Sequence, residues 1–311
     1  MSFKEQLKGR DLLTLADYSK AEIAYILELA AQIKDKQKKG IPYQPLQGKT
    51  LGMIFEKSST RTRVSFETGI YQLGGMGLFL SSNDIQLGRG EPISDTAKVL
   101  SGYLDGIMIR TFAQKDVEEL AENASIPVIN GLTDDFHPCQ VLADLQTIQE
   151  VKGSLEGLKL AYIGDGNNMA HSLMIGSAKM GLDVAIAAPK DYQPKAEITE
   201  LASSFANGTE VLVTEDAVEA VKDADVIYAD VWASMGQEEE QKEREKAFAY
   251  YQVNGELFAH AKPDAIFMHC LPAHRGEEVT ADIIDGPQSV VFQEAENRLH
   301  AQKALMVALM S

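Results

Sequence analysis

A cluster of hydroxyl and guanidinium side chains lies between residues 59 and 63, in the order Ser59, Thr60, Arg61, Thr62, Arg63. Hydroxyl groups are short neutral donors, and an arginine presents a planar charged fork that matches phosphate oxygens. These residue types at this spacing therefore predict a site for a phosphate group. The alternative is an ordinary helix cap followed by two solvated arginines, since Ser and Thr are common capping residues.

The flanking segments predict that this cluster lies in a turn between a strand and a helix. The apolar run 51–55 is typical of a buried strand. Three apolar residues then recur at helical spacing, namely Phe66, Ile70 and Leu73. At the N-terminus of a helix, the free backbone N–H groups and the positive end of the helix dipole favour an anion. A protein with a net charge of −17 that binds an anion must gather its arginines locally, and this turn is a suitable place for them.

Further polar groups follow other predicted strands in the same half of the chain. Arg110 comes directly after one predicted strand, and His137 and Gln140 belong to a His-Pro-Cys-Gln motif after the next. Taken alone, Arg110 suggests a surface salt bridge and His137 a helix cap or a core histidine. Ligands of open α/β sheets bind at the carboxyl ends of the strands. We therefore expect these three side chains to share one crevice with the cluster at 59–63.

In the second half of the chain, two turns after predicted strands carry polar groups. Asp230 lies near the end of one strand, and a short loop at 234–236 follows that could close over a small substrate. His269 and Cys270 follow a later strand. The usual spacings of structural zinc sites are absent, so we predict no metal there. A catalytic thiol would need an identifiable base, which the sequence alone does not supply.

A glycine-bearing turn, Gly-Asp-Gly-Asn-Asn at 164–168, links a predicted strand to a predicted helix. Such turns can bind dinucleotides, but this one lacks the third glycine of the usual fingerprint, and no acidic residue ends the next strand. A nicotinamide site is therefore a weak hypothesis. The two asparagines could instead bind a polar, zwitterionic ligand, or they could simply cap the helix.

The order of the predicted elements gives the fold class. Strands and helices alternate along the chain, which is typical of α/β proteins with parallel sheets and helices on both faces. The alternation stops near residues 150–157 and then begins again, so the 311 residues are expected to form two α/β domains. The last predicted elements are a strand at 290–292 and a helix from Glu294 onward.

Composition limits the classes of function. A hydrophobic fraction of 45% and a charged fraction of 24% are typical of a soluble globular protein. The net charge of −17 argues against a nucleic-acid binder, and no apolar stretch is long enough to span a membrane. Residues 1–10 are charged, and no signal-peptide core follows them. With two distant cysteines, Cys139 and Cys270, these features predict a reduced, cytoplasmic setting.

Four motifs together resemble the aspartate/ornithine carbamoyltransferase family, and its ornithine branch in particular. They are Ser-Thr-Arg-Thr-Arg at 59–63, His-Pro-Cys-Gln at 137–140, Asp230 with Ser-Met-Gly at 234–236, and His-Cys-Leu-Pro at 269–272. The resemblance extends from the first helix to the last. It implies an enzyme that makes citrulline and phosphate from carbamoyl phosphate and L-ornithine, with no metal and no organic cofactor.

The resemblance also implies a domain plan of two doubly wound parallel-sheet domains joined by helices. A carbamoyl phosphate-binding domain is expected at 1–150 and an ornithine-binding domain at 151–293. The C-terminal helix, at 294–311, is expected to pack back on the first domain. A homotrimer or a multiple of trimers is implied as well, with active sites between subunits and Gln86 reaching into a neighbouring site.

Roles for single residues follow from the same resemblance. The groups expected to bind carbamoyl phosphate are Ser59, Thr60, Arg61, Thr62, Gln86, Arg110, His137, Gln140, Cys270, Leu271 and Arg298. The groups expected to bind ornithine are Asn168, Asp230, Ser234 and Met235. The residues expected to act in catalysis are Arg61, Arg110, His137, Asp230 and Cys270.

Other activities stay open from the sequence. Putrescine or N-acetylornithine could be the acceptor, although the Ser-Met-Gly loop argues against putrescine, which has no α-carboxylate. An aspartate-specific enzyme would lack this loop and would need basic residues there. Outside the family, the turn at 164–168 leaves a nucleotide-dependent dehydrogenase as the alternative. A non-catalytic binding role for an inactive relative is disfavoured by the intact motifs.

Overall fold

The structure is a computed structural model, and it describes residues 2–233 and 240–311. The predicted loop residues Ser234 and Met235 therefore lie outside the described part of the chain. Within the described residues, no helix combines the length and the apolar character needed to cross a bilayer.

The chain divides into two compact units. The first unit comprises Met1–Gln146 and Glu296–Ser311, and the second comprises Thr147–Ala295. Two long helices, α6 (Pro138–Lys152) and α13 (Val291–Met310), contribute residues to both units. The C-terminal part of the chain thus belongs to the first unit.

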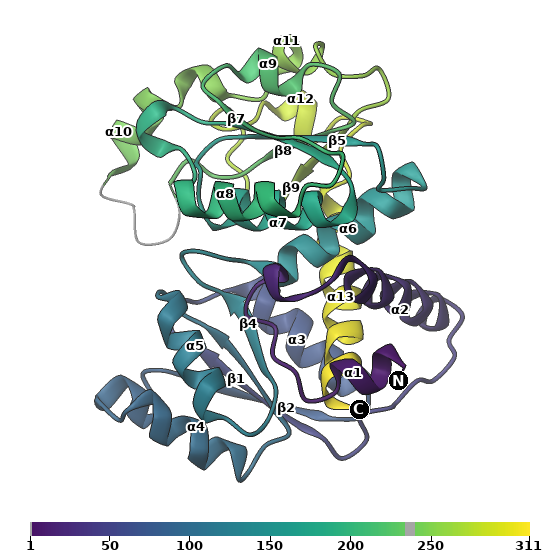
Figure 1. Cartoon of the computed structure of the whole chain (residues 1–311), viewed down its shortest axis with the longest axis vertical. Coiled ribbons are helices and arrows are strands. Elements are labelled where there is room, and N and C mark those ends of the chain that lie inside the picture. The colour runs from purple at the N-terminus through teal and green to yellow at the C-terminus, as the bar shows by residue number, and fades with distance from the viewer. Residues whose placement is uncertain (1, 234–239) are drawn as a thin grey trace. The chain divides into compact units, whose positions relative to one another are not determined.

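The first unit is built on a four-stranded parallel sheet (Figure 1). In the order in which they pair, the strands are β2 (Met76–Ser81), β1 (Thr50–Phe55), β3 (Gly106–Arg110) and β4 (Val128–Leu132). The chain passes from β1 to β2 on one side and returns to β3 on the other, so the strand order reverses between β1 and β3. Phe55 and Arg110 are paired at the carboxyl end of this point. Connections diverge at such a reversal and leave room for a ligand.

Helices cover both faces of this sheet, with α4 and α5 on one face and α3 and α13 on the other (Figure 1). The helices of the unit, besides α6 and α13, are α1 (Phe3–Leu7), α2 (Lys20–Lys38), α3 (Thr60–Gln72), α4 (Ile93–Ser101) and α5 (Gln114–Asn123). The contact between α3 and α13 is close at Gly69. A Cβ atom there would lie 3.0 Å from Cε of Met306 and 3.2 Å from Cγ of Lys303. The C-terminal helix therefore packs back on the first unit, as predicted.

The second unit contains a five-stranded parallel sheet (Figure 1). In pairing order the strands are β7 (Val211–Thr214), β6 (Asp183–Ala187), β5 (Lys159–Ile163), β8 (Val226–Ala229) and β9 (Ile266–His269). Its helices are α7 (Asn168–Met180), α8 (Ala196–Phe205), α9 (Ala217–Val221), α10 (Gln241–Ala247), α11 (Gly255–Phe258) and α12 (Ala281–Ile284). The strand order reverses between β5 and β8, where Ile163 pairs with Ala229. The predicted α/β class with two doubly wound parallel sheets is confirmed.

One predicted element is wrong. The segment 290–292 was expected to form a strand, but Val291 is the first residue of α13, and only Ser289 makes an isolated bridge, to Phe267. Three apolar residues are too few to distinguish a strand from the first turn of a helix. The burial pattern is that of a helix, because Val291 and Glu294, three residues apart, are buried whereas Phe292 is exposed.

His300 lies on α13 and is almost fully buried, with its Nε2 atom 3.3 Å from a carboxylate oxygen of Glu296. Burial lowers the pKa of His300 to about 4, and the positive charges of Lys34 and Lys303 act in the same direction. The unfolded chain would take up a proton on this residue near pH 6.5. The stabilising effect of a neutral His300 is therefore complete above about pH 6.5 and is lost as the pH falls toward 4.

We expect the variant His300→Gln to weaken the pH dependence of stability. Between pH 7 and pH 5, protonation of His300 in the unfolded chain alone should reduce the free energy of unfolding by about 2 kcal/mol. Urea unfolding at the two pH values measures this loss in both proteins. The variant should lose about 2 kcal/mol less than the parent protein, and an equal loss in both would contradict the assignment.

Candidate active site

The hydroxyl and arginine cluster forms the N-terminus of α3, directly after β1. Ser59 is the N-cap, and its hydroxyl oxygen accepts a hydrogen bond of 3.2 Å from the backbone N–H of Thr62. The capping interpretation is therefore correct for Ser59, and it is compatible with anion binding because the hydroxyl proton stays available. Thr60 is exposed and Arg61 is half-buried. Arg63 does not join them, since it is exposed and its guanidinium lies 3.7 Å from the ring centroid of Phe79.

A buried guanidinium from α13 connects α3 and α6 within the first unit. Arg298 donates to Oγ1 of Thr62 at 3.1 Å and to Oε1 of Gln140 at 2.7 Å. Its Nε atom donates to Oε1 of Gln302 at 3.0 Å. The amide of Gln140 in turn donates to a carboxylate oxygen of Asp144 at 2.9 Å. Three segments that are far apart in the sequence are thereby fixed around one positive charge.

His137 lies among three arginines. Burial holds the pKa of His137 well below its usual range, and the charges of Arg298, Arg110 and Arg61 lower it further, in that order. Arg110 is the last residue of β3 and is also buried. The imidazole is therefore neutral near pH 7 and can donate a single N–H hydrogen bond. These four side chains make a cationic group with a neutral donor, which suits an anion that also carries a carbonyl oxygen.

Gln86 lies apart from these residues in sequence and environment. It begins a short 3₁₀ helix after β2, and its side chain is exposed. Its predicted contribution to the site of a neighbouring subunit stays a prediction.

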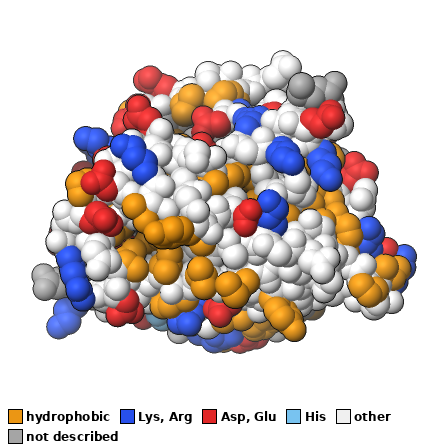
Figure 2. Space-filling view, turned by 90° about the horizontal axis from the view of Figure 1, so that it is seen from below, with side chains coloured by type: hydrophobic (Ala, Val, Ile, Leu, Met, Phe, Trp, Pro, Cys, Tyr) orange, Lys and Arg blue, Asp and Glu red, His pale blue; other side chains and the backbone are white. Residues whose placement is uncertain are grey.

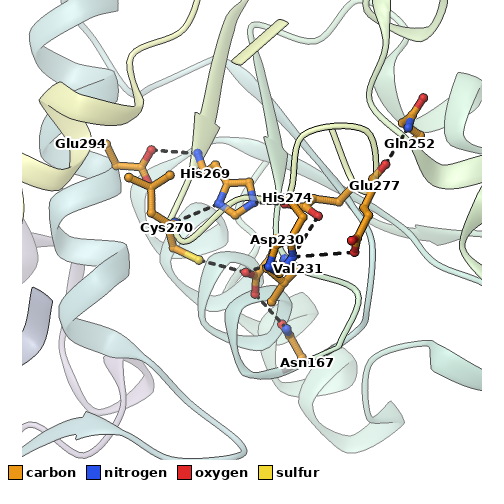
Figure 3. Close-up of polar contacts among 11 residues, drawn as sticks. Asn167, Asp230, Val231, Gln252, His269, Cys270, His274, Glu277 and Glu294 are labelled. Carbon is orange, nitrogen blue, oxygen red and sulfur yellow. Dashed lines mark hydrogen bonds and ion pairs between the residues drawn. The ribbon is translucent and has the colours of Figure 1, made fainter. Parts of the chain in front are cut away.

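In the second unit, Asp230 follows β8 and accepts three hydrogen bonds (Figure 3). Its Oδ1 atom accepts from the backbone N–H of Val231 at 2.8 Å and from the thiol of Cys270 at 3.1 Å. Its Oδ2 atom accepts from the side-chain amide of Asn167 at 3.0 Å. Asp230 is buried and Cys270 is half-buried, so the thiol and the carboxylate form a pair at a partly open position.

The backbone around Cys270 is held by a histidine. The backbone N–H of Leu271 donates to Nδ1 of His269 at 2.9 Å, so the other ring nitrogen, Nε2, carries the proton and donates to Glu278 at 3.0 Å. Leu271 has a φ of 59°, a conformation that costs a non-glycine residue free energy. The backbone N–H of His269 donates to Glu294 at 2.9 Å (Figure 3). Two fully buried carboxylates thus fix the turn that presents the thiol.

Sequence reasoning missed several of these supporting residues. Glu278 and Glu294 contact the Cys270 turn through His269, but isolated acidic residues carry no sequence signal for burial. The resemblance singles out Asn168, yet Asn167 is the residue that caps α7 and contacts Asp230. Its place directly before the predicted helix was an available signal. Asn168 is the first residue of α7, next to this group.

The ligand atoms of Asp230, His269 and Cys270 lie within 4.8 Å of one another, which is a distance compatible with a metal ion. Both ring nitrogens of His269 already have partners, Leu271 and Glu278. A metal would have to displace one of these buried hydrogen bonds. The geometry therefore agrees better with the prediction that no metal binds here, which stays a prediction.

Cys139 has a different environment from Cys270, although each follows a histidine within two residues in the sequence. Cys139 is fully buried, and its thiol donates to the carbonyl oxygen of Asn130 at 3.4 Å. Burial raises the pKa of Cys139 to about 12. This thiol is therefore inert, and its role is packing at the start of α6.

Comparisons with known proteins cover nearly the whole chain. Residues 10–150 match the model for the carbamoyl-P binding domain of aspartate/ornithine carbamoyltransferases, and residues 156–309 match the model for the Asp/Orn binding domain. Relatives named ornithine carbamoyltransferase include those of Oceanobacillus iheyensis and Bacillus subtilis. The first is 70% identical over 310 residues, which is 99% of this chain and 96% of the relative. The second is 64% identical over 307 residues, which is 98% of this chain and 95% of the relative.

Comparison with a solved structure also shows similarity to an ornithine carbamoyltransferase. The structure of the ornithine carbamoyltransferase from Pyrococcus furiosus has a TM-score of 0.95 and 58% sequence identity to this chain, and the match covers 98% of each. The motifs lie at strand ends, the two sheets are parallel, and both domain models match. The chain therefore belongs to the aspartate/ornithine carbamoyltransferase family.

Proposed function

We propose that this chain transfers the carbamoyl group of carbamoyl phosphate to the side-chain amine of L-ornithine, which gives L-citrulline and phosphate. The observation that carries the proposal is the environment of the buried His137, whose neutral imidazole lies among the buried Arg110 and Arg298 and the half-buried Arg61. Such a group suits an acyl phosphate, because it offers positive charge for the phosphate and a neutral donor for the carbonyl oxygen. The named relatives support the same donor and acceptor.

The donor would be held by the first unit. The side chains of Ser59, Thr60, Arg61 and Thr62 would bind the phosphate at the N-terminus of α3, where backbone N–H groups also favour an anion. Arg110 and His137 would donate to the carbonyl oxygen as it becomes negative in the tetrahedral transition state. The amino group of the donor would face Gln140. Phosphate would then leave as an anion that the same donors already neutralise.

The acceptor would be held by the second unit. The attacking amine of ornithine resembles that of lysine, with a pKa of about 10.4 in water, so it must lose a proton before it attacks. The pair formed by Asp230 and Cys270 offers a carboxylate that can take up the proton and a thiol that can help to orient the amine. Asn168, Ser234 and Met235 would bind the α-amino and α-carboxylate groups.

The acceptor identity is the finer part of the proposal. An acceptor with an α-carboxylate needs donors near Asp230, and the proposal is supported by Asn167, which contacts Asp230, and by Asn168 beside it at the start of α7. Putrescine lacks that carboxylate, and N-acetylornithine carries a blocked α-amine. L-Ornithine is therefore the acceptor that uses all of these groups.

The alternative of a nucleotide-dependent dehydrogenase is disfavoured by the turn at 164–168. In a dinucleotide site, the second glycine lets the backbone approach the pyrophosphate. Here Gly166 lets the protein's own chain approach, because a Cβ atom there would lie 2.2 Å from the backbone nitrogen of Pro194. The backbone N–H of Gly166 also donates to the carbonyl oxygen of Tyr192 at 2.8 Å. The segment after β6 thus fills the space that a pyrophosphate would need.

We further propose that the protein works in the cytoplasm in arginine biosynthesis, without a cofactor, as a homotrimer or a multiple of trimers. Strand β2 is the edge of its sheet, and Met76, Leu78 and Phe79 on it are exposed. Tyr71 and Val64 on the neighbouring helix are exposed as well. Figure 2 shows several hydrophobic side chains among charged ones on one face of the molecule. Exposed apolar groups on an edge strand favour contact with another subunit.

The functional domains are proposed to follow the predicted plan. Residues 1–150 would bind carbamoyl phosphate and residues 151–293 would bind ornithine. The C-terminal helix, 294–311, would return Arg298 to the donor site. The hydrogen bonds from Arg298 to Thr62 and Gln140 support this last point.

Replacing Arg61 with glycine should reduce kcat/KM by about 10³-fold, because one charged donor to the transition state is lost. The matched control is Arg63→Gly, which makes the same backbone change in the same helical turn. Arg63 contacts Glu67 and the Phe79 ring, so this variant should lose no more than about threefold. Steady-state citrulline formation measures both. Equal losses in the two variants would remove Arg61 from the proposed donor site.

Replacing Cys270 with alanine should lower kcat by about tenfold or more and change the pH profile of kcat, since the thiol and Asp230 act on the same amine. The profile is measured by citrulline formation between pH 6 and pH 9. Cys270→Ser, which keeps a hydrogen-bond donor to Asp230, should lose less. If kcat and its pH profile were intact in the alanine variant, Cys270 would have no part in the proton transfer.

Comparison of acceptors tests the proposed function itself. Phosphate release from carbamoyl phosphate should be fast with L-ornithine and at least about 100-fold slower in kcat/KM with putrescine or N-acetylornithine, because each lacks one recognised group. Calorimetric titration with NAD(P) should give no binding heat. Preferred turnover of another amine would change the acceptor, and NAD(P) binding would revive the dehydrogenase alternative.

A further inference from the structure

The first unit has a surface depression that takes no part in the proposed reaction. It has a volume of about 260 Å³ and lies where α2 ends. Its lining includes Lys36 and Gln37 of α2, the segment 40–43 that follows, Gln72 at the end of α3 and Lys303 of α13. All of these residues belong to the same unit.

Lys303 is the unusual side chain of this depression. It is 4% exposed, and its Nζ atom donates to Oε1 of Gln37 and to Oε1 of Gln72, both at 2.8 Å. Both acceptors are neutral amides, so the ammonium group has lost water without gaining a negative partner. Burial lowers the pKa of Lys303 to about 8, and no charged group offsets this effect. His300, one helical turn away, is itself neutral near pH 7 because its pKa is about 4.

Lys36 lines the same depression but has a different environment. It is half-buried, and its Nζ atom lies 4.2 Å from the ring centroid of Tyr43. That contact is made by the charged form of the amine, since the ring face attracts a cation. The two lysines therefore share one cavity but differ in whether the surroundings stabilise the ammonium group.

We propose that Lys303 is a carbamoylation site, at which cyanate formed from carbamoyl phosphate adds to the neutral Nζ amine. The proposed function enters only as the source of carbamoyl phosphate, which gives cyanate when its phosphate is eliminated. The nitrogen lone pair attacks the carbon of isocyanic acid, HN=C=O, the protonated form of cyanate, and the carbon–nitrogen π bond breaks. A proton moves from the amine to the isocyanic acid nitrogen. The product is a ureido side chain, with no leaving group and no change of oxidation state.

The neutral fraction of the amine explains why cyanate should react at Lys303 in preference to an ordinary lysine. With a pKa of about 8, about a quarter of Lys303 is neutral at pH 7.5, whereas an ordinary lysine with a pKa of about 10.4 is about 0.1% neutral. A less basic amine is also a weaker nucleophile, which reduces but does not cancel the advantage. Among the described lysines whose pKa is lowered by burial, Lys303 should therefore be the first to react.

The size of the reagent and the chemistry of the product also fit the site. Cyanate has only three heavy atoms, so a depression of about 260 Å³ admits it next to a buried amine. The ureido product is neutral and keeps N–H donors for the amide oxygens of Gln37 and Gln72. Modification therefore removes a buried charge without leaving those acceptors unpaired.

The test uses the full-length protein and potassium cyanate at pH 7.5, with the rate of carbamoylation of each lysine followed by peptide mass spectrometry. Lys303 should react about tenfold faster than Lys36 and the exposed Lys39, after allowance for its weaker nucleophilicity. The α-amine is excluded from the comparison because its ordinary pKa is already about 8. A rate at Lys303 equal to or below that of Lys36 would overturn the proposal.

A variant tests whether the missing negative partner is what makes Lys303 reactive. Gln72→Glu would place a carboxylate next to Nζ of Lys303, favour the ammonium form, and slow its carbamoylation about tenfold while leaving Lys39 unchanged. An unchanged rate at Lys303 would show that the missing negative partner is not the cause. The cyanate reaction needs no transferase activity, so it should proceed equally in Arg61→Gly. Failure at Lys303 in a protein that makes citrulline would overturn this inference alone.

Discussion

The candidate donor site depends on positive charge gathered around one buried imidazole. Arg61, Arg110 and Arg298 all act on the pKa of His137, in a protein whose net charge is −17. Arg298 donates to the hydroxyl oxygen of Thr62 and to the amide oxygen of Gln140, and these two neutral groups help to position the guanidinium. Like charges held close together repel, and a bound phosphate would relieve that repulsion. A cluster arranged in this way before binding would suit the anionic donor of the proposed reaction.

The two units have opposite electrostatic character at their candidate sites. In the first unit, burial and then the charges of three arginines lower the pKa of His137. In the second unit the candidate site is built from a carboxylate and a thiol, with two more carboxylates, Glu278 and Glu294, behind it. An acyl phosphate is an anion, and ornithine carries its reacting amine as a cation until a proton leaves. Each unit thus presents the charge that its proposed substrate requires, and the reaction needs both.

Much of this arrangement could be predicted from the sequence, because the alternation of strands and helices places every strand end on one edge of a parallel sheet. The turn at 59–63, Arg110 and His137 were assigned to such ends from pattern alone, and the fold confirms those positions. Arg298 could not be placed in this way. Its partners Thr62 and Gln140 are 236 and 158 positions away, and no local pattern reports a contact over that distance. Only the resemblance to a family placed it.

Sequence patterns alone could not distinguish residues whose chemistry depends on how they are buried. Cys139 and Cys270 both follow a histidine motif, yet one thiol is enclosed with a pKa near 12 and the other faces a carboxylate in a half-buried turn. Gly166 has the place of a dinucleotide-binding glycine, but the backbone at Pro194 occupies the space it leaves. In both cases the sequence specifies the reactive atom or the free space, and the packing around it decides what can reach it. Packing therefore decides the chemistry of the two thiols, since it encloses Cys139 but leaves Cys270 half-buried beside Asp230, at the candidate site of the second unit.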